Sequence, residues 1–315
     1  MIPAACWARS SDHRDDVPEP MKASITSGLT RNLAGADVIA KPQPPFPARR
    51  HLEGRARDGS WASALLMAHA APVLVLAALA VLLAAFHGDQ WLADRLYASQ
   101  GHRWVLRSAF VTEDLVHLIG RALSTAAWLG VLAAWVWARF RPDLSAWRTP
   151  LACLLVSTLL ATAVVAWIKS WSNMDCPWDL ARYGGTREFI GWLSLRPVGM
   201  PRAGCFPAGH ASAGYAWMAL YFFLLATRPR WRWLGLAVGI ALGLLFGVGQ
   251  QLRGAHFLSH DLWTAAICWA CALGGYLFFQ GRSRALAEVH IPAAPGHANL
   301  AARASASWQA PAGAQ

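Results

Sequence analysis

The chain has 315 residues, of which 56% are hydrophobic and only 14% charged, with 18 tryptophans and a mean hydropathy of +0.31. Soluble domains carry about 25% charged residues, so this balance excludes an ordinary soluble protein and favours an integral membrane protein. The formal net charge of +11 would suit a nucleic-acid ligand. Most of the arginines flank apolar runs, however, so we expect no nucleic-acid partner.

The two ends of the chain lack the periodic apolar pattern of a folded domain. Residues 1–60 are rich in Pro, Ala, Ser and Arg, and the last part of 281–315 is rich in Ala and Pro. We expect both segments to be disordered cytoplasmic tails on either side of a membrane domain at 61–280. The start of the chain has no apolar core of the signal-peptide type, so no cleaved export signal is expected.

Six apolar runs between the tails are predicted to cross a bilayer, which takes about 20 helical residues. In chain order they are Trp61–Phe86, Ile119–Val136, Leu151–Ile168, Ala211–Ala226, Leu234–Val248 and Leu262–Phe279. The sequence therefore predicts an all-α polytopic membrane protein built as a bundle of six transmembrane helices.

Arginine is concentrated in every second connection of this expected bundle. Clusters precede the first span, separate the second from the third and the fourth from the fifth, and follow the sixth. Their members are Arg49, Arg50, Arg55, Arg57, Arg139, Arg141, Arg148, Arg228, Arg230, Arg232, Arg282 and Arg284. The positive-inside rule places these segments and both termini in the cytoplasm. The abundant Ala, Arg and Trp indicate a bacterial source, so we expect a multi-pass protein of the bacterial inner membrane.

The opposite connections face outward in this topology, and they carry the polar residues that are able to do chemistry. Three stretches stand out: Lys169–Gly185, Phe206–Gly214 and Gln250–Trp263. The candidate side chains that they supply are Lys169, Arg182, His210, Arg253, His256, His260 and Asp261. We therefore expect a periplasmic site.

Cations beside two histidines and a carboxylate are typical of a site for phosphoryl transfer. Phosphate oxygens require Lys or Arg and backbone N–H donors. The Gly209–His210 turn would present such N–H groups at the positive end of a helix. One imidazole can attack phosphorus while a second protonates the departing oxygen. An acidic neighbour would set the tautomer of the attacking imidazole.

In these stretches the sequence resembles the type 2 phosphatidic acid phosphatase superfamily, whose pattern is K-x6-R-P, then P-S-G-H, then S-R-x5-H-x3-D. The matching positions are Lys169 and Pro177, then Pro207, Gly209 and His210, and finally His256. The resemblance covers roughly Trp61–Gln280. It implies a six-helix core, a phosphohistidine intermediate, and neither a metal ion nor another cofactor.

Four positions depart from the family pattern. Cys176 and Gln250 stand where arginine is usual, Ala208 where serine is usual, and His260 where aspartate is usual. The last of these departures is followed at once by an acidic residue, Asp261.

Nearby residues are able to replace the lost groups. Arg253 lies about one helical turn after the missing arginine, and Arg182 lies in the preceding outward loop. Asp261 would orient the ring of His256; otherwise His260 or a backbone carbonyl does so.

The resemblance implies a distinct role for each of these residues. His256 attacks phosphorus and His210 protonates the leaving group. The phosphate-binding set is Lys169, Arg253, Arg182 and the backbone amides of Gly209 and His210.

Cys176 and Cys205 are the two cysteines in outward-facing polar loops. In an oxidising compartment they are expected to form a disulfide that joins the Lys169 loop to the His210 turn. The alternative is a pair of free thiols packed in the loop.

The expected function is removal of a phosphate from a lipid at the periplasmic face. The candidate substrates are phosphatidic acid, phosphatidylglycerol phosphate, undecaprenyl pyrophosphate and the phosphates of lipid A. Two alternatives stay open, namely a lipid phosphotransferase of the same fold and a non-catalytic membrane protein that binds or transports lipid. A rhomboid-type protease is disfavoured because Ser212 lies in H-A-S-A-G and not in a G-x-S-G turn. A zinc enzyme is disfavoured because H-E-x-x-H spacing is missing.

Overall fold

The computed structural model of the chain describes residues 60–112, 119–191, 199–200 and 202–289, which all fall within one unit, Pro44–Gln315. Residues 1–59, 113–118, 192–198, 201 and 290–315 lie outside the described residues. The expected N-terminal tail and its arginine cluster therefore fall outside, as does most of the C-terminal tail. The membrane domain was expected to end at Gln280, but the last helix continues to Val289.

The described residues form helices joined by turns and by longer irregular segments. The long helices are α1 (Ser60–Ala85), α3 (Gly120–Phe140), α4 (Ser145–Ser172), α7 (Arg232–Leu252) and α8 (Leu258–Val289). The shorter ones are α2 (Gly88–Ser99), α5 (Gly209–Tyr215) and α6 (Leu220–Thr227). The 3₁₀ turns are η1 (Val105–Ser108), η3 (Pro142–Leu144), η4 (Pro177–Asp179), η5 (Ala181–Tyr183), η6 (Ala216–Ala219) and η7 (Pro229–Trp231).

Within the described residues, five helices are long and apolar enough to cross a bilayer. The fold is therefore that of an all-α polytopic membrane protein, as the sequence predicts. The fourth expected span, Ala211–Ala226, differs from the others because it is not one long α-helix. It is built from α5, η6 and α6, which follow one another without a break from Gly209 to Thr227.

This composite span packs against α7 at very short range. Gly235, Gly239 and Gly243 recur every fourth residue along α7 and so lie on one face of the helix. A Cβ atom at Gly239 would collide with the backbone nitrogen of Met218 on η6. A Cβ atom at Gly214 on α5 would collide with the backbone of α7. Small residues thus allow the two backbones to touch, which is how helices pack tightly within a membrane.

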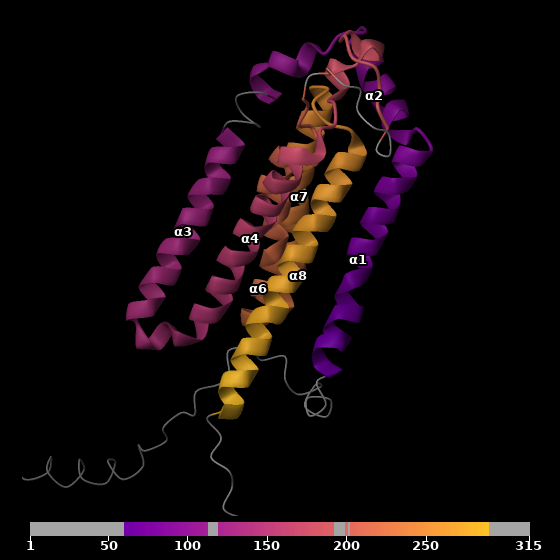
Figure 1. Cartoon of the computed structure of the whole chain (residues 1–315). Helices are drawn as coiled ribbons and strands as arrows, with labels where there is room; N and C mark the ends of the chain where they lie inside the picture. Colours follow the sequence, from indigo (N-terminus) through magenta and orange to yellow (C-terminus); the bar gives the residue numbers. More distant parts are fainter. Residues whose placement is uncertain (1–59, 113–118, 192–198, 201, 290–315) are drawn as a thin grey trace, which may run out of the picture. The chain divides into compact units, whose positions relative to one another are not determined.

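Helix α8 lies between α1 and α4 and also contacts α5 (Figure 1). Its packing against α1 includes a hydrogen bond of 2.8 Å from the indole nitrogen of Trp269 to the carbonyl of His69. Pro72 lies three residues later in α1 and has no N–H to donate to the carbonyl of Ala68. The bond from Trp269 thus joins α8 to α1 close to the turn that Pro72 interrupts.

The connecting segments that the sequence analysis placed outside the membrane meet at one end of the helices (Figure 1). The backbone N–H of Trp178 donates to the carbonyl of Gly254 at 2.9 Å, which ties the α4–α5 connection to the α7–α8 link. The hydroxyl of Tyr183 donates to the carbonyl of Gln90 at 3.2 Å, which ties the α4–α5 connection to α2. Three segments far apart in the sequence thus form one surface.

The close contact between η6 and the glycines of α7 predicts that a methyl group added at this contact lowers the stability of the protein, whereas one added elsewhere does not. We expect Gly239→Ala to lower the free energy of unfolding by about 1–3 kcal/mol, because the new Cβ atom overlaps backbone that cannot move aside. Gly274→Ala in α8 is the control, since no atom lies within 4 Å of its added Cβ atom. Thermal unfolding in detergent measures both changes, and equal midpoints for the two variants would contradict the contact.

Candidate functional site

Lys169 lies in the last turn of α4, and its side chain packs along two glycines of the α4–α5 connection. A Cβ atom built on Gly209 would lie 3.5 Å from the ammonium nitrogen Nζ, and one built on Gly204 would lie 4.0 Å from Cε. The bare backbone at these positions leaves room for the half-buried ammonium group. The close approach brings Lys169 to the first residue of α5.

His210 is the second residue of α5, and the turn before it is held between α4 and α8. The hydroxyl of Ser172 donates to the carbonyl of Phe206, and the hydroxyl of Thr264 donates to the carbonyl of Ala208 at 3.3 Å. These bonds satisfy the irregular backbone from both sides. They also set the position from which α5 begins, and hence the position of His210.

His256 lies in the link between α7 and α8, and its ring is buried. Burial lowers the pKa of this ring well below its usual range, and three neighbouring ionisable groups lower it further. They are His260, Lys169 and His210. The carbonyl of Cys205 opposes the shift by accepting a hydrogen bond from the ring. His256 is therefore neutral at neutral pH, with a lone pair on the ring, and it lies close to both Lys169 and His210.

His260 is the third residue of α8 and is fully buried. Its ring centroid lies 5.8 Å from that of His256, in an edge-to-face arrangement. Two phenyl rings, Phe206 and Phe257, pack edge-on against it with centroids 5.3 and 5.5 Å away. The second imidazole thus packs beside the first inside an aromatic enclosure.

Asp261 faces α7. The side-chain amide of Gln251 donates a hydrogen bond to its carboxylate, and a Cβ atom on Gly247 would lie 2.8 Å from Oδ2. The motif spacing predicted that this carboxylate orients the ring of His256. In the structure its hydrogen bond goes to Gln251, and the backbone carbonyl of Cys205 contacts the His256 ring.

Two predicted phosphate-binding arginines have partners of their own. Arg253 caps the end of α7 and donates from Nε to the carbonyl of Arg107 at 2.8 Å. Arg182 lies at the exposed surface, where its guanidinium forms an ion pair of 2.5 Å with Asp94 on α2. This pair raises the pKa of Arg182 and lowers that of Asp94. The structure thus engages Arg182 with α2 and not with the histidines.

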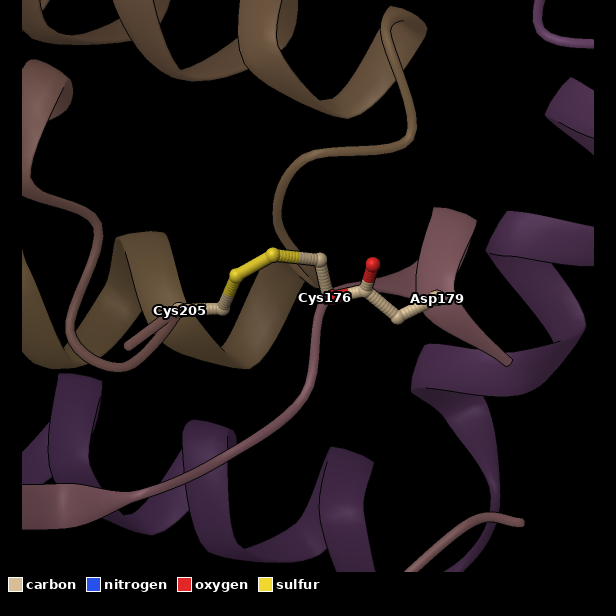
Figure 2. A group of neighbouring side chains, drawn as sticks. All are labelled: Cys176, Asp179 and Cys205. Carbon is tan, nitrogen blue, oxygen red and sulfur yellow. A yellow bond between two sulfur atoms is a disulfide. The ribbon is translucent and has the colours of Figure 1, made fainter. Parts of the chain in front are cut away.

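Cys176 and Cys205 are joined by a disulfide, with their Cα atoms 5.3 Å apart (Figure 2). The backbone N–H of Cys205 also donates to the carbonyl of Met174 at 3.0 Å. Asp179 lies close enough to the two sulfurs for the three side chains to resemble a metal-binding group. Sulfurs bonded to each other offer no thiolate to a metal ion, however, and Asp179 lies 3.8 Å from the guanidinium of Arg187. The disulfide fastens the segment after Lys169 to the turn before His210.

Asp89 on α2 is a buried carboxylate that the sequence analysis did not single out. It accepts hydrogen bonds from the backbone N–H of Ser259, at 2.9 Å, and from its hydroxyl. Burial raises the pKa of Asp89, and these two bonds oppose the rise. A carboxylate at this point caps the first turn of α8, immediately after His256. The sequence signal was weak because α2 is short and was expected to be loop.

A cavity of about 470 Å³ opens between α3, α4 and the α5–η6 segment. Lys169, Gly209 and His210 line it, together with Thr158 and Trp128 farther along α4 and α3. Arg121, in the first turn of α3, lines the same cavity. Arg121 was not among the predicted site residues, although a charge two positions inside the expected span Ile119–Val136 is an unusual signal.

The disulfide predicts which cysteines react with an alkylating reagent and how much stability is lost when the bond is removed. Alkylation of the denatured protein without reductant should label four of the six cysteines, leaving Cys176 and Cys205 unlabelled. Replacing both by serine should lower the free energy of unfolding by about 2–4 kcal/mol, because the bond closes a long loop of 29 residues. Cys271→Ala, at a free cysteine, is the control. Labelling of all six cysteines would contradict the bond.

The two acidic residues of α2 should differ sharply in their contribution to stability. Asp89→Ala removes a charged cap from α8 and should cost about 1–3 kcal/mol. Asp94→Ala removes an exposed ion pair and should cost less than about 1 kcal/mol. Thermal unfolding of both variants in detergent tests the difference. A larger loss for Asp94→Ala would show that the cap at Ser259 does not hold α8.

Comparison with known proteins yields one match. Residues 150–284 match the model of the PAP2 superfamily. The matched segment begins in α4, ends in α8 and contains Lys169, His210 and His256. No curated protein and no solved structure matches the chain.

Proposed function

Since residues 150–284 form a PAP2 superfamily domain within a multi-pass membrane protein, we propose that the protein is a lipid phosphate phosphatase. Members of this superfamily are generally phosphatases. One observation carries the proposal for this chain. The ammonium group of Lys169 and the imidazole of His210 line one cavity between membrane helices, and both groups lower the pKa of the nearby buried His256.

The first step of the proposed reaction is binding of the phosphate. The ammonium of Lys169 contacts the phosphate oxygens, and the backbone N–H groups at Gly209 and His210 donate to them. Gly209 suits this role because it has no side chain to separate Lys169 from the start of α5. The phosphate then lies beside His256, whose pKa is lowered in part by Lys169 and His210.

The chemical step is nucleophilic substitution at phosphorus. His256 is neutral, so its lone pair attacks phosphorus and forms an N–P bond, and the bond to the leaving oxygen breaks. His210 donates a proton to that oxygen. A water molecule then attacks the phosphohistidine and gives its proton to His210, which releases phosphate and restores His256.

We place this site on the periplasmic side of a bacterial inner membrane, with both termini in the cytoplasm. The distribution of arginine between alternate connections supports this orientation. The disulfide between Cys176 and Cys205 also supports it, because such bonds persist in oxidising compartments.

The cavity supports a lipid as the source of the phosphate. Trp128, Leu159 and Trp217 line it with apolar surface, which suits a hydrocarbon chain whose head group stays at Lys169. The proposed substrates are phosphatidic acid, phosphatidylglycerol phosphate, undecaprenyl pyrophosphate and the phosphates of lipid A. Transfer of the phosphate to a second lipid would use the same first step, and the product analysis below distinguishes the two reactions.

The proposal predicts phosphate release from at least one of these lipids in detergent with EDTA present. His256→Ala should reduce the rate to background, because no other group forms the N–P bond. His210→Ala should reduce it by about 100-fold or more, which is typical of losing a general acid. His102→Ala, at an exposed histidine before α3, is the control and should leave the rate unchanged.

Colorimetric detection of inorganic phosphate measures these rates. Chromatography of the lipids shows whether phosphate is released or appears on an acceptor lipid. Full activity of the His256→Ala variant would overturn the assignment.

A further inference from the structure

Arg121 lies outside the segment that matches the PAP2 superfamily, yet it lines the same cavity as Lys169 and His210. We propose that Arg121 is a substrate-binding residue, whose guanidinium holds the anionic head group of a lipid phosphate in this cavity. This inference rests on the proposed function, because it assigns a second cation to the same substrate.

The position of Arg121 along α3 places it at the head-group end of the cavity. The short turn η3 joins α3 to α4, and the two helices pack against each other, so they run antiparallel. The first turn of α3 and the last turn of α4, which carries Lys169, therefore lie at the same end of this helix pair. With a rise of 1.5 Å per residue, Trp128 lies about 10 Å farther along α3, and Thr158 lies about 16 Å back along α4. The two cations thus share one end of the cavity, and the tryptophan and the threonine line the other.

Hydrogen bonds hold this part of α3 against the catalytic segment. The hydroxyl of Ser124 donates to the carbonyl of Ala213 on α5 at 2.8 Å. The indole nitrogen of Trp217 on η6 donates to the same hydroxyl at 2.9 Å. Arg121 lies less than one turn from Ser124. Its Cα atom is therefore fixed relative to His210, while its long side chain stays exposed at the cavity.

The charge of the cavity indicates the class of ligand. Arg121, Lys169 and His210 line it, and none of the described lining residues is Asp or Glu. A phosphate monoester carries up to two negative charges, which a single ammonium group does not balance. A guanidinium adds planar, paired donors that match two phosphate oxygens. Positive groups at one end and the indole of Trp128 toward the other fit a lipid with an anionic head group.

The test measures binding in the absence of turnover. The parent protein is the full chain with His256→Ala, and the probe is a fluorescent phosphatidic acid titrated in detergent. Adding Arg121→Gln should raise Kd by about tenfold or more, as expected for loss of a charge-assisted contact. Arg121→Lys should give an intermediate Kd, because it retains the charge and loses the paired donors.

Two controls separate a head-group contact from a change in structure. Arg139→Gln removes an exposed arginine from the opposite end of α3, where it packs over Trp135, and should leave Kd within twofold of the parent. A fluorescent diacylglycerol, which lacks the phosphate, should bind equally well with and without Arg121→Gln. Equal weakening for both lipids would overturn the inference.

The remaining outcomes distinguish this inference from the proposed function. A Kd for phosphatidic acid that stays within twofold after Arg121→Gln, while Lys169→Gln weakens binding, would overturn the role of Arg121 and leave the phosphatase proposal intact. Failure of the parent to bind phosphatidic acid would also overturn it. If the unmodified protein releases no phosphate from any lipid, yet Arg121→Gln still weakens binding, the inference stands and the phosphatase proposal fails.

Discussion

Three connecting segments are tied together at one end of the helices, and the candidate site depends on these ties. Asp89 on α2 caps the start of α8 at Ser259. The disulfide between Cys176 and Cys205 closes the α4–α5 connection on itself, and the hydrogen bond from Trp178 to Gly254 holds that connection against the α7–α8 link. Each tie satisfies irregular backbone or joins loops that would otherwise be independent. Lys169, His210 and His256 come from three different segments, so without these ties they would have no fixed arrangement.

The electrostatic character of this arrangement follows from what surrounds the histidines. Lys169 lies near His256, while Asp261 turns toward Gln251 and Asp89 is committed to Ser259. Burial is the main cause that opposes protonation of His256, and repulsion from the ammonium of Lys169 acts in the same direction. An anion entering the cavity would relieve this repulsion. The excess of cationic over anionic groups near His256 helps to keep its imidazole neutral, and the same excess makes the site suited to phosphate.

Packing within the membrane sets how the catalytic segment meets the rest of the protein. The glycines of α7 let the α5–η6 segment approach it at backbone distance, so His210 begins a helical run that is held along its length. Helix α3 packs on α4 and on α5, and the cavity lies between these three. A lipid-sized space and the histidine cluster therefore arise from one set of helix contacts.

Much of the fold could be predicted, because apolar length and arginine placement are local properties of the sequence. They determined the membrane class and the long helices, and the motifs pointed to Lys169, His210 and His256 as one group. Only the tertiary structure showed that Asp261 bonds to Gln251, that Arg182 pairs with Asp94, and that Asp89 and Arg121 belong near the site. The physical reason is that sequence patterns report local interactions, whereas these pairings join segments that are far apart in the chain. Residue type and spacing report what a helix turn or a motif can do, whereas the partner of a charged side chain depends on which distant segment packs beside it.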